Sequence, residues 1–69
     1  MGLIVLKVKG ITDEDDERRI KDAIELLEDV DEATANWEEE IVVVKSQKDV
    51  KTKDIVSIIE DIGYYVEEE

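Results

Sequence analysis

Residues 3–24, LIVLKVKGITDEDDERRIKDAI, change from one hydrophobic period to another and so decide the fold. Residues 3–9 are mostly aliphatic and β-branched and stop at Gly10, which predicts a strand. The side chains expected on its buried face are Ile4, Leu6 and Val8. From Ile20 onward the apolar positions follow the i, i+3, i+4, i+7 spacing of one helical face. They are Ile20, Ala23, Ile24 and Leu27. The stretch therefore predicts a strand followed by a helix over about residues 13–28.

The start of this helix carries an uninterrupted acidic run over residues 13–17. Thr12 precedes the run, and a hydroxyl at an N-cap accepts a hydrogen bond from an otherwise unpaired backbone N–H. Carboxylates in the first turn also lie against the positive end of the helix dipole. The sequence therefore predicts Thr12 as the N-cap and the acidic residues as the first turn.

Two further strands are predicted in the middle of the chain. Residues 32–37 alternate between apolar and polar side chains, and residues 41–45 are mostly β-branched. The charged residues 38–40 join them, so we expect a hairpin although no Asn-Gly or Asp-Gly turn is present. The sequence leaves open whether Trp37 joins the core or forms an exposed contact.

A second helix and a last strand complete the pattern. The helical face consists of Ile55, Ile58, Ile59 and Ile62. Residues 46–51 are a polar loop, and Thr52 is a second N-cap candidate. Gly63 stands where a helix C′ glycine belongs, so we expect Tyr64 to fold back on Ile59. Residues 64–66 are the expected last strand.

The predicted order of elements is β-α-β-β-α-β within one domain, residues 1–69. Two helices that are apolar on one face only must bury those faces against one face of a sheet. Right-handed crossovers then give an α+β, ferredoxin-like fold with an antiparallel sheet in the order 4-1-3-2. Leu3 and Val5 fall on the outer sheet face with Lys7 and Lys9.

Composition excludes several function classes. The chain has 69 residues, 21 acidic and 9 basic, for a formal charge of −12, and it contains no Cys, His, Pro or Phe. Without Cys or His there is no thiolate or imidazole for catalysis or metal binding. The charge argues against nucleic acid and against an anionic membrane surface. We therefore expect no enzyme, no cofactor and no targeting segment, and a cytoplasmic location if any is assigned.

The motifs resemble those of the heavy-metal-associated domain family, which includes copper chaperones and modules of copper ATPases. That family's pattern is a strand, Gly-Met-Thr-Cys-x-x-Cys, a helix with an apolar residue four positions later, and a second helix closed by Gly-Tyr. Here residues 10–16 are Gly-Ile-Thr-Asp-Glu-Asp-Asp, Ile20 holds the apolar position, and residues 62–64 are Ile-Gly-Tyr. The resemblance spans residues 3–66 and implies the ferredoxin-like fold.

The resemblance breaks at the metal-binding positions. Both motif cysteines are replaced, by Asp13 and Asp16, and the methionine by Ile11. Carboxylates are hard ligands and bind Cu(I) poorly, so the family's soft-metal chemistry is not implied. Asp13, Asp15 and Asp16 are instead candidate ligands for Ca²⁺, Mg²⁺ or Mn²⁺. Helix capping and solubility explain the same residues without a ligand.

Three interpretations follow for function. The first is a non-catalytic scaffold, designed or redesigned, because caps, periodicity and charged surface all agree with one fold. The second is a degenerate natural domain that binds a protein partner through the outer sheet face or the lysine-rich stretch of residues 45–53. The third is weak hard-cation binding by the acidic segment. We expect a monomer, with a protein partner possible but unidentified.

Overall fold

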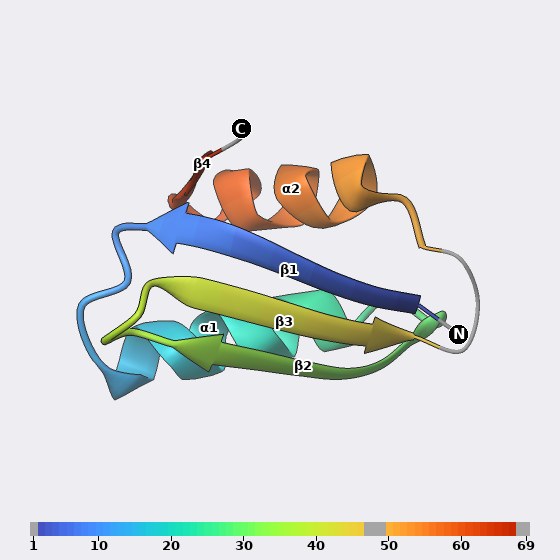
Figure 1. The fold of residues 1–69 in the computed structure, drawn as a ribbon, viewed down its shortest axis with the longest axis horizontal. Helices are drawn as coiled ribbons and strands as arrows, with labels where there is room; N and C mark the ends of the chain where they lie inside the picture. The colour runs from blue at the N-terminus through green and yellow to red at the C-terminus, as the bar shows by residue number, and fades with distance from the viewer. Residues whose placement is uncertain (1, 47–49, 68–69) are drawn as a thin grey trace.

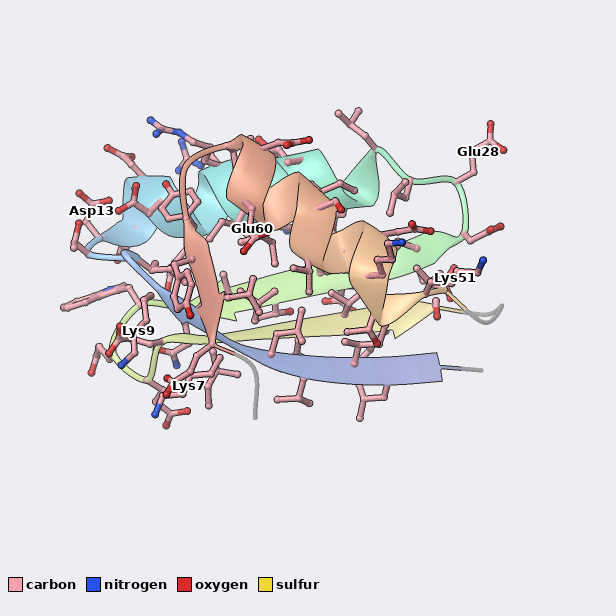
Figure 2. The ribbon with its side chains drawn as sticks, turned by 90° about the horizontal axis from the view of Figure 1, so that it is seen from above. Lys7, Lys9, Asp13, Glu28, Lys51 and Glu60 are labelled. Atoms are coloured by element: carbon pink, nitrogen blue, oxygen red, sulfur yellow. The ribbon has the colours of Figure 1, made fainter. Side chains whose placement is uncertain are left out.

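The computed structural model describes residues 2–46 and 50–67, which form a four-stranded antiparallel sheet and two helices. The elements are β1 (Gly2–Lys9), α1 (Glu14–Glu25), β2 (Val30–Asn36), β3 (Ile41–Ser46), α2 (Thr52–Asp61) and β4 (Tyr65–Glu67). The sheet order is β2-β3-β1-β4, and both helices lie on the same face (Figure 1, Figure 2). The predicted α+β, ferredoxin-like fold with strand order 4-1-3-2 is therefore confirmed.

The core lies between the helices and the inner face of the sheet. Its fully buried side chains are Val8, Ile20, Ile24, Val42, Val44, Ile55 and Ile59. Ile4 and Leu6 are half-buried and pack against this cluster. Leu3 and Val5 lie on the other face of β1 and are 64% and 59% exposed. The predicted orientation of the first strand is correct, because alternate side chains of a strand point to opposite faces.

Helix α1 ends three residues before the predicted limit of residue 28. Its last turn has no basic residue, no glycine follows it, and two backbone hydrogen bonds connect the end of the helix to the segment that leads into β2. The N–H of Leu27 donates to Ile24 O, and that of Val30 donates to Leu27 O. Val30 is buried and already belongs to β2, which begins two residues earlier than predicted.

Both predicted N-cap residues are wrong. The N-cap of α1 is Asp13, and that of α2 is Lys51, whose side chain makes no cap hydrogen bond. Thr52 is the first residue of α2 rather than its cap. The N-cap residue of a helix has an extended backbone conformation, and Asp13 has that conformation (φ −158°).

The C-terminal end of α2 is as predicted. Gly63 has φ +101°, its N–H donates to Glu60 O at 3.0 Å, and the Tyr64 N–H donates to Ile59 O at 3.2 Å. These two bonds form a Schellman motif. The loop predicted over residues 46–51 is only partly described. Ser46 is buried in β3, and residues 47–49, including Lys48, lie outside the described residues.

The hairpin between β2 and β3 turns without a glycine. Asn36 Oδ1 accepts hydrogen bonds from the N–H groups of Glu38 and Glu39, at 2.9 and 3.2 Å. Glu40 then adopts φ 59°, a left-handed conformation that a glycine usually supplies. A local side-chain turn centred on Asn36 therefore replaces the missing turn dipeptide.

Candidate functional site

The loop between β1 and α1 is the candidate site, because it contains the residues that stand at the motif positions. Gly10 has φ +100°, and a Cβ at this position would lie 3.5 Å from Tyr64 Cδ1. Ile11 is buried in the core with only 4% of its surface exposed. The loop is thus held at its start by the ring of Tyr64 and by an apolar side chain that points inward.

Asp13 caps α1. Its Oδ1 accepts a hydrogen bond of 3.0 Å from the backbone N–H of Asp16, one of the four N–H groups that a helix start leaves unpaired. Four acidic residues follow in the first turn, where the helix dipole favours negative charge. Asp13 therefore stabilises the start of α1 through a hydrogen bond to the local backbone.

Asp16 receives three hydrogen bonds on its carboxylate. The N–H and the hydroxyl of Thr12 both donate to Oδ2 at 3.0 Å. The Tyr64 hydroxyl donates to Oδ1 at 2.5 Å, across 48 positions of sequence. One half-buried carboxylate thus connects the loop, the start of α1 and the segment that follows α2.

These contacts set the ionisation of the pair. The hydrogen bond from Tyr64, followed by that from the Thr12 backbone, lowers the pKa of Asp16 below its ordinary value of 3.8. Burial raises the pKa of Tyr64 above 10.0, and the hydrogen bond to Asp16 adds to that effect. At neutral pH an ionised acceptor therefore faces a protonated donor.

The three candidate cation ligands have separate roles. Asp13 and Asp16 are adjacent but use their oxygens on backbone and side-chain donors, while Asp15 is exposed in the first turn. Within residues 2–46 and 50–67, no cluster of three or more acidic side chains is arranged to hold a metal ion. Hard-cation binding by Asp13, Asp15 and Asp16 stays a prediction.

Sequence reasoning missed the roles of Tyr64 and Thr12. Tyr64 was expected only to fold back on Ile59, and it is indeed buried, but its hydroxyl also donates to Asp16. The signal available in the sequence was the Ile-Gly-Tyr ending of α2, since a C′ glycine turns the next residue back over the helix. No local pattern shows that its hydroxyl faces Asp16.

The alternative contact residues lie on the surface. Trp37 is 39% exposed, which settles the choice left open by its strand pattern in favour of the surface. Lys45, Lys51 and Lys53 are exposed as well. Among the described residues, no helix is long and apolar enough to cross a membrane.

Comparisons with known proteins agree with the fold and the motif. A family model described as the heavy-metal-associated domain matches residues 5–65. The curated proteins gave no match.

Solved structures match over nearly the whole chain. One is a CopZ metallochaperone, with 26% identity, a TM-score of 0.89, and coverage of 94% of this chain and 98% of that chain. A putative copper-ion-binding protein from Bacillus anthracis has 30% identity and a TM-score of 0.84, over 96% and 94%. A copper binding domain from a P-type ATPase has 27% identity and a TM-score of 0.87, over 97% and 92%. These structures share the fold of this chain.

Proposed function

The chain belongs to the heavy-metal-associated domain family, and we propose that it is a non-catalytic scaffold in which a hydrogen-bond network stands at the soft-metal position. The observation that carries this proposal is the Asp16 carboxylate, whose two oxygens accept three hydrogen bonds from Thr12 and Tyr64. A side chain used in this way holds the loop together and needs no ion to satisfy it.

The chemistry of the ligand atoms supports the same proposal. The family's ions, such as Cu(I), prefer soft thiolates, and the sequence has neither Cys nor His. Asp13 and Asp16 offer hard oxygens, so the residues at the motif positions do not fit a soft ion. The same composition supports a role without catalysis, because a nucleophile with an imidazole or thiolate partner cannot be assembled.

A metal titration tests the proposal directly. We expect Cu(I), Zn²⁺ and Ca²⁺ to leave the backbone amide resonances of residues 10–17 in place. Saturable shifts confined to this loop, with micromolar affinity, would instead support cation binding by Asp13, Asp15 and Asp16.

Restoring the thiolates tests the positional correspondence. We expect Asp13→Cys with Asp16→Cys to bind Cu(I) while keeping the fold, because two thiolates would then stand at the motif positions. The matched control is Asp13→Ser with Asp16→Ser, which removes the same carboxylates and adds no soft ligand. A folded double-cysteine variant without Cu(I) affinity would show that these positions do not correspond to the family's ligands.

A protein-interaction module is the second candidate function. It is favoured by the outer sheet face, where Leu3 and Val5 are exposed beside Lys7. We expect Leu3→Asp with Val5→Asp to abolish binding of such a partner without unfolding the domain, since neither side chain belongs to the core. A partner that binds this variant as tightly as the original chain would exclude the outer face.

Designed origin is a further part of the proposal. Capping, periodicity, the C′ glycine and the charged surface agree with one fold, which is the consistency sought in designed scaffolds. Idealised designs are typically hyperstable, so we expect thermal unfolding above about 90 °C. An unfolding midpoint in the ordinary range of about 45–65 °C would favour a natural domain.

A further inference from the structure

The sheet has an open edge at β2, and two glutamates of α1 bind it. The backbone N–H of Ala33 donates to Glu25 Oε2 at 3.1 Å. The N–H of Trp37, directly after β2, donates to Glu17 Oε2 at 2.8 Å. Both bonds join side chains of the helix to main-chain donors that point away from β3.

The spacing of these contacts matches the two elements. Glu17 and Glu25 are eight residues apart, which is about 12 Å along a helix at about 1.5 Å per residue. Ala33 and Trp37 are four residues apart, or about 13 Å along an extended chain at about 3.3 Å per residue. In an antiparallel ladder, alternate residues direct their N–H groups to the same side, so the two donors belong to one row. The carboxylates therefore occupy positions where the carbonyls of a neighbouring strand would lie.

Helix α1 packs against β2, and Ala33 is almost completely buried. Beside this contact lies an open hollow of about 460 Å³, lined partly by Ala33, Thr34 and Ala35 of β2 and by Lys21 of α1. The carboxylates of Glu25 and Glu17 reach past the body of the helix to accept from the backbone N–H groups of Ala33 and Trp37. Removing both carboxylates would leave the Ala33 and Trp37 N–H groups without these acceptors at the edge strand of the sheet.

We propose that Glu17 and Glu25 close the β2 edge against pairing with β2 of a second copy of the chain. A second copy is the occupant that the geometry favours, because two identical edges pair antiparallel about a twofold axis and each donor row meets the other's acceptors. Covering an exposed edge in this way is a known protection against edge-to-edge association.

Two double variants separate hydrogen bonding from charge. Glu17→Ala with Glu25→Ala removes the acceptors, whereas Glu17→Gln with Glu25→Gln removes the same two negative charges but keeps an amide carbonyl that accepts. We expect sedimentation equilibrium to show a dimer that grows with concentration for the alanine pair alone. The salt concentration should be physiological, where the Debye length is about 8 Å and repulsion between the acidic copies is partly screened.

Amide hydrogen exchange supplies a second measurement, whose first part uses the original chain alone. In the original chain we expect the Ala33 and Trp37 amides to be protected, and monomeric alanine variants at low concentration to exchange them about fivefold faster, as loss of one hydrogen bond implies. Unprotected Ala33 and Trp37 amides in the original chain would overturn the proposal. The proposal would also be overturned if the alanine and the glutamine double variants both stayed monomeric. It would be overturned as well if both dimerised, because the loss of charge rather than of hydrogen bonds would then explain the association.

Discussion

The two helices of this domain begin in different ways. The first turn of α1 is held by side chains: Asp13 caps the Asp16 N–H, and the Asp16 carboxylate accepts from Thr12 and Tyr64. By contrast, the N-cap of α2 is Lys51, whose side chain makes no cap hydrogen bond. Figure 2 shows Asp13 and Lys51 at opposite ends of the molecule.

The difference shows two ways to fix a helix start. The start of α2 depends on backbone bonds from the N–H groups of Asp54 and Ile55 to Lys51 O, together with the burial of Ile55. The start of α1 follows a loop that must hold its shape beside the end of α2, and polar side chains provide that shape. Substitutions at the two ends should therefore have opposite effects.

The largest effect on this comparison is expected from Asp16→Ala. It removes the acceptor of three hydrogen bonds at once and leaves the part-buried Tyr64 hydroxyl without its partner. We expect the greatest loss of unfolding free energy in the series, measured by urea denaturation. Asp15→Ala is the matched control, since it removes a first-turn charge whose side chain makes no hydrogen bond to the described residues. Equal losses for the two would mean that charge alone matters at this helix start.

The same bonds give stability a definite dependence on pH. The folded pKa of Asp16 is lowered, so its contribution is present above the unfolded value of about 3.9 and is lost as pH falls through the folded pKa. The folded pKa of Tyr64 is raised, so its contribution is present below about pH 10 and is lost as pH rises through the folded pKa. Asp16→Ala should remove the part of the acid-side change in unfolding free energy that comes from this carboxylate. An unchanged profile of unfolding free energy against pH would contradict the assignment.

Tyr64→Phe should have the next largest effect. It keeps the ring against Gly10 and removes only the hydroxyl that donates to Asp16. We expect a loss of about 1 kcal/mol in unfolding free energy, the net value of a typical hydrogen bond. Tyr65→Phe, at an exposed residue, is the control. In the double variant with Asp16→Ala the Tyr64→Phe loss should vanish, and additive losses would show that the two groups are not coupled.

Asp13→Ala tests the cap alone. The substitution leaves the Asp16 N–H without its side-chain acceptor, and we expect a loss of about 0.5–1 kcal/mol in denaturant unfolding. Asp13→Ser keeps an oxygen that can cap and should recover most of the loss. If serine is as destabilising as alanine, the cap bond is not the source of the effect.

Lys51→Asp should change stability in the opposite direction and by the smallest amount. The N-cap position of α2 is extended, with φ −73° and ψ 129°, and has no side-chain cap, so an aspartate there could accept from the first turn. We expect a gain of about 0.5 kcal/mol in unfolding free energy. Lys53→Asp places the same charge in the first turn without the cap geometry and should gain less. A gain at both positions alike would assign the effect to the helix dipole.

Much of the fold could be predicted from periodicity. The helical spacing from Ile20 and the alternation around Leu6 each depend on residues close in sequence, so they predict the elements and their buried faces. Element ends were less predictable, because α1 stops where the chain must turn to bury Val30 in β2. The hairpin was expected, but the form of its turn was not, because the side chain of Asn36 makes a local turn in place of the usual glycine.

The sequence by itself determined the order of elements, the apolar faces, the C′ glycine at Gly63 and the absence of thiolates, because each depends on residue types at short spacing. Only the tertiary structure decided that Tyr64 reaches Asp16 across 48 positions, and that Glu17 and Glu25 meet the backbone of the β2 edge. These contacts depend on how the helices lie against the sheet, and that arrangement follows from packing of the whole core rather than from any local pattern.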